Sequence, residues 1–181
     1  IQKLIGVPFR DKNYLVTFHP ETLEDSSSPK EQIKNLLKCL EKQDDASIIF
    51  TKANADPGGK AVNIEIQKFV EKYPHRSSLH ASLGHLNYIS TMKYCSAVIG
   101  NSSSGIIEAP SLQIPTINIG SRQKGRTKSV NIINCKNSIP EILDAFKKLT
   151  RLKLDSVDNP YDGGDTSKMI MKIIKDTNLD S

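Results

Sequence analysis

Short apolar runs alternate with longer amphipathic stretches along most of the chain. This alternation predicts an α/β protein, because buried strands are short and apolar whereas surface helices are apolar on one face only. The predicted strands lie at 14–18, 47–51, 97–100, 115–119 and 130–133, with a weaker one at 78–81. Their near-continuous apolar character is typical of parallel strands that are covered on both faces.

The clearest helix start in the sequence lies at Ser28. Serine at the capping position, Pro29 at the first helical position and Glu31 three residues after the cap together favour a helix, which we expect to end near Lys42. Further helices are predicted at 59–72, 88–94, 105–112, 139–149 and 166–175, with a loop at 155–165. Because no internal repeat or long linker interrupts this pattern, we expect one three-layer, Rossmann-like domain built on a parallel sheet.

Composition places the chain among ordinary globular proteins. Its 181 residues are 37% hydrophobic and 25% charged, which is enough for one well-packed domain. No apolar run approaches the roughly 20 residues of a membrane helix, and the N-terminus does not resemble a secretory signal. We therefore expect a soluble, cytoplasmic protein that does not associate with a membrane.

Charge and cysteine usage narrow the expected partners. The formal net charge is +5, but the lysines are spread over several predicted helices without aromatic residues between them, which argues against nucleic-acid binding. Cys39, Cys95 and Cys135 are far apart and lack the paired spacing of a metal site. The sequence thus predicts reduced thiols, and neither a metal ion nor a cofactor.

Polar segments follow four of the predicted strands. They occupy 19–21, 52–56, 101–105 and 120–126. In doubly wound sheets the ligand binds beyond the carboxyl ends of the strands. We therefore expect these four segments to meet at one edge of the sheet and to form the functional site.

The serine triplet at 102–104 lies between a predicted strand and a predicted helix, and three interpretations were weighed. A helix start with small residues can bind a phosphate on its free N–H groups. A plain capped helix fits equally well. A nucleophilic serine would require the pattern G-x-S-x-G, but counting from Gly100 the closing position is Ser104, and Gly105 comes one residue late. A serine hydrolase is therefore disfavoured, and the other two interpretations remain open.

Neighbouring residues favour phosphate. Arg122, Lys124 and Arg126 follow the next strand and could bring positive charge to the same helix start, although a basic loop in solvent is the plain alternative. Glu108, expected on the first helical turn, could complement the helix dipole or accept hydrogen bonds from ribose hydroxyls. His19, at the end of a predicted strand, becomes a candidate functional residue because it is expected to lie near these groups.

Four segments together resemble the UDP-N-acetylglucosamine 2-epimerase family: 16–20, 51–56, 98–110 and 115–126. The resemblance is to the hydrolysing branch. The other branch typically has an acidic residue and consecutive glycines where this chain has Asn-Ser-Ser-Ser-Gly at 101–105. The closing segment 159–165 is also similar to the family, with Asp-Gly-Gly in place of the usual Gly-Asp-Gly.

The resemblance implies a two-domain enzyme of the glycosyltransferase-B type. Residues 1–181 would be its C-terminal, UDP-binding domain, while the N-terminal domain with most of the acid and base carboxylates would be absent from this chain. The family's reaction removes the C2 proton of UDP-N-acetylglucosamine, eliminates UDP to leave a glycal, and adds water to give N-acetylmannosamine for sialic-acid-type synthesis. This fragment would bind UDP without turnover, and the full-length form would be a homo-oligomer.

The resemblance also implies roles for individual residues. Ser102 and Ser103 would bind the diphosphate at the helix start, Arg122 would clamp it, and Glu108 would bind the ribose. His19 would face the leaving diphosphate or the substrate and is the catalytic candidate.

The remaining family positions concern the base. Leu83 and Tyr88 match the region that holds uracil, and Asn54 would lie near the nucleotide. Tyr88 could equally pack in the core, and His85 receives no role. Two other functions stay open: a glycosyltransferase of the same architecture, and a non-catalytic nucleotide-binding module.

Overall fold

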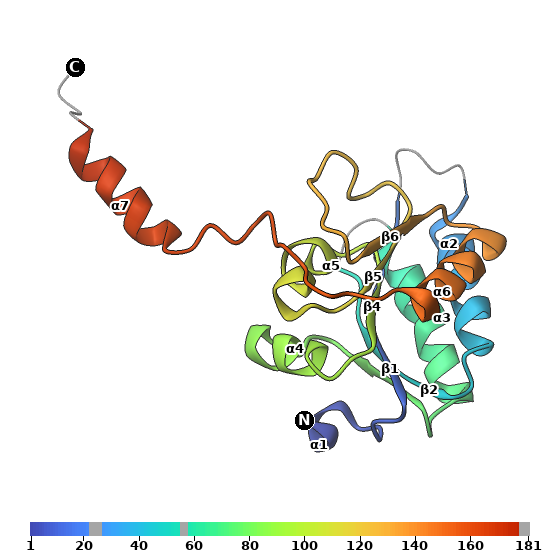
Figure 1. Cartoon of the computed structure of the whole chain (residues 1–181). Helices are drawn as coiled ribbons and strands as arrows, with labels where there is room; N and C mark the ends of the chain where they lie inside the picture. Colours follow the sequence, from blue (N-terminus) through green and yellow to red (C-terminus); the bar gives the residue numbers. More distant parts are fainter. Residues whose placement is uncertain (22–26, 55–57, 178–181) are drawn as a thin grey trace.

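A six-stranded parallel sheet forms the centre of the protein (Figure 1). The computed structural model describes residues 1–21, 27–54 and 58–177. The strand order is β3-β2-β1-β4-β5-β6, which is the order of the doubly wound dinucleotide-binding fold. The strands are β1 (Lys12–Thr17), β2 (Ala46–Thr51), β3 (Ser77–His80), β4 (Ala97–Gly100), β5 (Thr116–Ile119) and β6 (Ile132–Cys135). The predicted α/β, Rossmann-like class is confirmed.

Strand register brings the carboxyl ends of the central strands level. Thr17 at the end of β1 pairs with Thr51 at the end of β2 and with Gly100 at the end of β4. Gly100 in turn pairs with Asn118 of β5. The segments that follow these strands therefore leave the sheet along one edge.

Helices cover both faces of the sheet, and each face has its own apolar core (Figure 1). One face carries α2 (Pro29–Glu41), α3 (Gly59–Lys72) and α6 (Ile139–Arg151). The other carries α1 (Gln2–Ile5), α4 (His85–Met92), α5 (Ser104–Ile107) and the 3₁₀ helix η1 (Ala109–Leu112). Val16 and Phe50 point into the first core and Leu15 and Ile49 into the second, as alternation along a strand requires.

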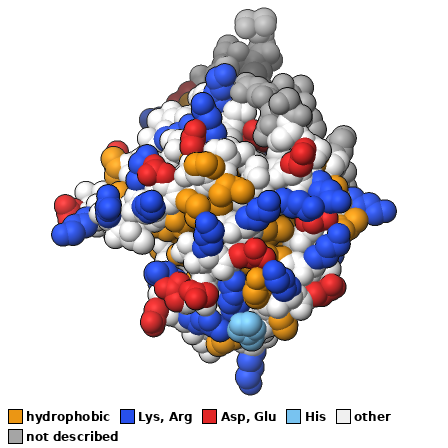
Figure 2. All heavy atoms as spheres, turned by 90° about the vertical axis from the view of Figure 1, so that its right-hand side faces the viewer, with side chains coloured by type: hydrophobic (Ala, Val, Ile, Leu, Met, Phe, Trp, Pro, Cys, Tyr) orange, Lys and Arg blue, Asp and Glu red, His pale blue; other side chains and the backbone are white. Residues whose placement is uncertain are grey.

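The start of α2 has the predicted capping box. The hydroxyl of Ser28 accepts from the backbone N–H of Glu31, and the Glu31 carboxylate accepts from the backbone N–H of Ser28. Figure 2 looks onto the side of the molecule that carries this helix and shows basic and acidic side chains interspersed on it. In the part of the chain described, no helix combines the length and the apolar character that a membrane span needs.

Several elements differ from the predictions. β6 starts at Ile132, two residues late, because Val130 is 70% exposed while the buried Asn131 donates to the carbonyl of Ile114. The predicted helix 105–112 is divided into α5 and η1, where Pro110 supplies no N–H for a continuous α-helix. Helix α4 begins three residues before the predicted start and ends two residues before the predicted end, and α1 was not predicted.

The C-terminal helix α7 (Thr166–Asp176) projects from the body of the molecule (Figure 1). It confirms the helix predicted at 166–175. None of its residues is buried, and Met169, Ile173 and Ile174 are each more than half exposed. The preceding loop contacts the body through Asn159, whose amide donates to the carbonyl of Ile107.

Candidate functional site

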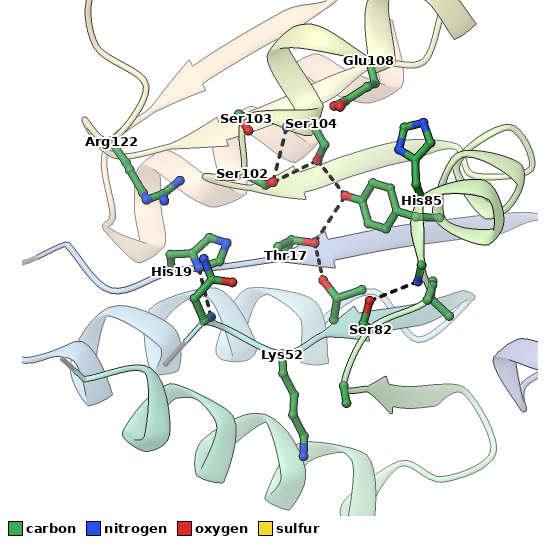
Figure 3. Close-up of a pocket in the computed structure, with 16 residues that line it drawn as sticks. Thr17, His19, Lys52, Ser82, His85, Ser102, Ser103, Ser104, Glu108 and Arg122 are labelled. Carbon is green, nitrogen blue, oxygen red and sulfur yellow. Dashed lines mark hydrogen bonds between the residues drawn. The ribbon is translucent and has the colours of Figure 1, made fainter. Parts of the chain in front are cut away.

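A pocket of about 450 Å³ lies at the carboxyl edge of the sheet (Figure 3). It is formed by the segments that follow five strands, β1 to β5: the four that the sequence predicts, after β1, β2, β4 and β5, and in addition the segment after β3. All eight residues proposed from the sequence line it: His19, Asn54, Leu83, Tyr88, Ser102, Ser103, Glu108 and Arg122. The structure thus brings together residues that are up to about a hundred positions apart in the chain.

Several lining residues received no role from the sequence. They are Thr17, Thr51, Lys52, Ser82, His85 and Ser104, with Ala81 and Gly84. Lys52 follows a strand directly, so its position was the available signal, but its side chain points away from the serine triplet (Figure 3). Asp56, which belongs to one of the segments behind the family resemblance, lies outside the described residues.

Glycine at position 100 turns the chain from β4 into the serine triplet. Its φ is +132°, and a Cβ there would lie 2.0 Å from the carbonyl oxygen of Thr17. Only glycine lets the turn pass this close to β1. The serines are therefore held directly above the end of the central strand.

The serine triplet does not behave as a simple helix cap. Ser103 directly precedes α5 but makes no capping hydrogen bond, and the one backbone N–H that donates to Ser102 Oγ in the described chain, that of Ser104, does so over a long 3.4 Å. Within the described chain, the backbone N–H groups of Ser103 and Gly105 have no hydrogen-bond acceptor. The helix start therefore offers unpaired donors to the pocket, as a phosphate site requires.

Asn101 connects three of the loops that form the pocket. Its Oδ1 accepts from the backbone N–H of His19 at 2.7 Å, and its Nδ2 donates to the carbonyl of His19 at 2.8 Å. Its own carbonyl accepts from Arg122 Nη1 at 3.2 Å and from Gln123 Nε2 at 2.8 Å. Because Asn101 is fully buried, this network fixes His19 and Arg122 relative to the serine triplet.

His19 is almost completely buried at the floor of the site. Its Nδ1 accepts from the backbone N–H of Asn54 at 3.4 Å. Because Nδ1 accepts here, Nε2 is the ring nitrogen that is able to donate.

Arg122 is the one member of the predicted basic loop that reaches the pocket. Lys124 and Arg126 are exposed and do not line it. The Arg122 and Glu108 side chains point toward the serine triplet from opposite sides (Figure 3). A charged donor and a charged acceptor therefore flank the helix start.

Glu21 anchors the loop that carries Arg122, a contact that the sequence does not reveal. Its Oε1 accepts from the backbone N–H groups of Ser121 and Arg122, each at 3.0 Å, and its Oε2 accepts from Ser121 Oγ at 3.2 Å. Gly120 has φ +80°, and a Cβ there would lie 2.3 Å from Glu21 Oε1. The backbone amides of Ser121 and Arg122 are thus occupied by a protein carboxylate, so what this loop presents to the pocket is the Arg122 side chain.

Glu108 lies at the end of the single turn of α5, not on the first turn of a longer helix as predicted. Its carboxylate therefore does not complement the helix dipole. Oε2 of Glu108 is buried and has no hydrogen-bond partner in the described part of the chain. A buried carboxylate oxygen without a partner at the wall of a pocket is available to accept from ligand hydroxyls.

Tyr88 and Leu83 form the side of the pocket opposite Arg122. The Tyr88 ring packs against the apolar core that contains Leu83 and Met92. Its phenol is 2.7 Å from Ser104 Oγ. Burial raises the pKa of Tyr88, although its hydrogen bonds to Ser104 and Thr17 act in the opposite direction, so the phenol stays protonated in neutral solution.

The groups that line this pocket are ones that suit a phosphorylated ligand. Helix-start N–H groups without an acceptor in the described chain, two serine hydroxyls and one guanidinium suit a diphosphate, and the Glu108 oxygen that lacks a partner there suits a sugar diol. The third serine, Ser104, is hydrogen-bonded to Tyr88 and to Ser102 and is therefore used within the protein. Across residues 1–21, 27–54 and 58–177, no three His, Cys, Asp or Glu side chains are grouped to hold a metal ion.

Comparison with known proteins agrees with the family resemblance. Over 149 residues the chain is 45% identical to a Campylobacter jejuni GDP/UDP-N,N'-diacetylbacillosamine 2-epimerase (hydrolyzing), covering 82% of this chain and 38% of that protein. It is 35% identical to the Escherichia coli polysialic acid biosynthesis protein P7 over 168 residues, covering 90% of this chain and 42% of that protein. The chain thus spans about 40% of the length of these curated relatives.

The fold also matches solved structures. The crystal structure of UDP-GlcNAc 2-epimerase from Neisseria meningitidis bound to UDP-GlcNAc superposes with a TM-score of 0.70 at 18% identity, covering 92% of this chain and 45% of that one. At this identity the match concerns the fold alone. The family model for UDP-N-acetylglucosamine 2-epimerase matches residues 3–175, nearly the whole chain. With its pocket, its sheet order and this match in agreement, the chain belongs to the UDP-N-acetylglucosamine 2-epimerase family.

Proposed function

We propose that this chain is the UDP-binding part of a hydrolysing 2-epimerase that acts on a UDP-linked 2-acetamido sugar. The observation that carries the proposal is the pocket itself. Among the described residues, it combines helix-start N–H groups that have no acceptor with a guanidinium on one side and, on the other, a carboxylate whose buried oxygen Oε2 has no partner. That set of groups matches the diphosphate and the ribose of a nucleotide.

In this proposal the diphosphate binds to Ser102, Ser103 and the amides of the helix start, and Arg122 clamps it. Each charge-assisted hydrogen bond contributes about 1.5–3 kcal/mol. A few of them therefore reach the roughly 8 kcal/mol of micromolar binding.

The nucleoside lies on the other side of the pocket in the same proposal. Glu108 accepts hydrogen bonds from the ribose hydroxyls, and Leu83 and Tyr88 hold the uracil. Asn54 lies near the nucleotide at the end of β2. These roles are supported by the position of all four residues in the wall of one pocket.

The proposed reaction has two steps, an elimination and an addition of water. A base removes the C2 proton while the bond from C1 to the diphosphate oxygen breaks, which leaves a glycal and UDP. Water then adds across the double bond, with hydroxyl on C1 and a proton on C2 from the opposite face, to release the free C2 epimer. His19 and Arg122 face the departing diphosphate and stabilise its negative charge, as electrostatic catalysis requires.

We further propose that residues 1–181 correspond to the C-terminal half of a glycosyltransferase-B type enzyme, and that an N-terminal domain supplies most of the acid and base carboxylates. The share of about 40% that the chain covers in its relatives supports this division. For the same reason we expect this chain to bind UDP without turnover. We also propose, from the family resemblance, that the full-length enzyme is a homo-oligomer in the cytoplasm. Light scattering of the full-length protein tests the oligomeric state.

The sugar is expected to carry an acetamido group at C2. The relative at 45% identity is named for a 2,4-diacetamido sugar and supports a second group at C4. Offering the full-length protein UDP-N-acetylglucosamine and UDP-N,N'-diacetylbacillosamine in parallel distinguishes the two. Release of free epimerised sugar and UDP without any acceptor is the expected result, whereas transfer that depends on an acceptor would indicate a glycosyltransferase.

Binding of UDP to this chain tests the pocket directly. We expect calorimetry to show UDP binding, and the Arg122→Ala variant to bind roughly tenfold to a hundredfold more weakly. Lys124→Ala is the matched control, because this residue lies in the same loop but outside the pocket. Equal affinity of wild type and Arg122→Ala would contradict the site.

A further inference from the structure

A chain of five hydroxyl groups crosses the floor of the pocket. Thr51 Oγ1 lies 2.6 Å from Thr17 Oγ1, which lies 3.4 Å from the phenol oxygen of Tyr88. The phenol lies 2.7 Å from Ser104 Oγ, which donates to Ser102 Oγ at 3.0 Å. Dashed lines in Figure 3 show this path from Thr17 to Ser104 and Ser102. The chain links β1 and β2 to the serine triplet through α4.

The direction of the hydrogen bonds follows from counting hydrogens. Each hydroxyl has one hydrogen to donate. Since Ser104 donates its hydrogen to Ser102, the phenol of Tyr88 must donate to Ser104. The phenol hydrogen is then used, so Thr17 donates to Tyr88 and Thr51 donates to Thr17.

Ser102 is the end of this chain and lines the pocket. Its oxygen accepts from the hydroxyl and from the backbone N–H of Ser104. Its own hydrogen has no acceptor among the described residues and is left for a ligand. Ser103 also lines the pocket, but in the described chain its hydroxyl has no partner to orient it.

Burial strengthens the hydrogen bonds between these five hydroxyl groups. Thr17, Thr51 and Ser104 are each less than a tenth exposed, and the raised pKa of Tyr88 keeps its phenol a donor. In a buried chain of this kind each hydrogen bond polarises the next one. The hydroxyl at the open end is therefore a better donor than an isolated serine.

We propose that Tyr88 is a positioning residue that, through Ser104, presents the Ser102 hydroxyl as a fixed donor to the phosphate of the bound ligand. The inference rests on the proposed nucleotide function and deepens it. The Tyr88 ring packs beside the base, while its phenol acts on the phosphate without touching it. The effect of the phenol therefore reaches the ligand only through Ser102.

A double-mutant cycle in this protein tests the proposal, with the affinity for UDP measured by calorimetry. Tyr88→Phe keeps the ring and removes only the hydroxyl. We expect Tyr88→Phe and Ser102→Ala each to weaken UDP binding about threefold to tenfold. In the Ser102→Ala background, Tyr88→Phe should have no further effect, whereas in a Ser103→Ala background it should keep its full effect.

A purely structural role is excluded by a second readout. Uridine has no phosphate, so its affinity, measured by ligand-observed NMR, should be the same for wild type and Tyr88→Phe. The matched control is Tyr94→Phe, an exposed tyrosine just beyond the end of the same helix, which should bind UDP like wild type. Thermal unfolding of each variant identifies any that is not folded.

The outcomes separate the two claims. If wild type does not bind UDP, the proposed function falls and the inference falls with it. If wild type binds UDP but Tyr88→Phe binds it equally well, or if the effects of Tyr88→Phe and Ser102→Ala multiply independently, the inference alone is overturned. A matching loss of uridine binding in Tyr88→Phe would also overturn it.

Discussion

Replacing Gly120 with alanine tests the anchoring of the Arg122 loop by Glu21. The new Cβ would lie 2.3 Å from Glu21 Oε1 and 2.7 Å from its Cδ. Both distances are far below a van der Waals contact, so the carboxylate must move away and lose its hydrogen bonds from the Ser121 and Arg122 amides.

The expected loss of stability has two parts. A non-glycine residue at φ +80° costs about 1–2 kcal/mol of backbone strain. Displacing the carboxylate breaks charge-assisted hydrogen bonds that contribute about 1.5–3 kcal/mol each, partly recovered by water at this half-buried site. We expect Gly120→Ala to lower the free energy of unfolding by about 3 kcal/mol.

Gly125→Ala separates these two parts. Gly125 has nearly the same φ, +82°, but an added Cβ there would have no atom within 4 Å. It should therefore cost only the backbone strain. Urea unfolding followed by circular dichroism gives both values, provided that the slope with denaturant is unchanged.

A double-mutant cycle with Glu21 tests whether the clash with this residue causes the extra loss of stability in Gly120→Ala. In a Glu21→Ala background, Gly120→Ala should cost no more than Gly125→Ala, because the clash is gone. Gly120→Ala should also weaken UDP binding, since Arg122 is carried by the same loop. Equal costs of Gly120→Ala and Gly125→Ala in the wild-type background would refute the reasoning.

Three further predictions concern the ribose contact, acid stability and the thiols. Glu108→Gln should weaken UDP binding about threefold to tenfold but leave binding of 2',3'-dideoxy-UDP unchanged, and an equal loss for both ligands in calorimetry would contradict the ribose contact. The hydrogen bond from Lys68 and the charges of nearby lysines lower the pKa of Glu65 below its ordinary 4.5. The ionised carboxylate therefore stabilises the folded protein above pH 4.5, and this stabilisation is lost as the pH falls through the lower pKa of the folded state. Glu65→Gln should flatten the pH dependence of the free energy of unfolding, measured in urea, below about pH 4.5. Burial raises the pKa of the Cys95 thiol to about 12, so it should react with a thiol reagent at pH 8 only after unfolding, and rapid reaction in the folded protein would contradict this burial.

Much of the fold was predictable because its signals are local. The apolar runs at 47–51 and 97–100 become β2 and β4, since central parallel strands are buried on both faces and leave no polar position to confuse the pattern. The capping box at Ser28 predicts the start of α2 because its two hydrogen bonds join residues only three apart. Boundaries at the sheet edge were less accurate, because at β6 the pairing with β5 decides where the strand begins.

The location of the site was also predictable, since parallel strands bring the segments after their carboxyl ends to one edge. That rule and the family motifs place Ser102, Glu108 and Arg122 in one pocket. The contacts inside the pocket were not predictable. Glu21 and Ser121 are a hundred positions apart, and nothing in either local sequence indicates that they meet.

The sequence by itself therefore predicts the class of fold and the edge of the sheet at which the pocket lies, because periodicity, capping and the turn from a strand into its next segment act over a few residues. The tertiary structure decides which polar groups are already used within the protein and which remain for a ligand. Glu21 accepts from the Ser121 and Arg122 amides after β5, Ser104 is hydrogen-bonded to Tyr88, and one oxygen of Glu108 has no partner in the part of the chain that the structure describes. These assignments depend on distances between segments that only packing of the helices on the sheet sets.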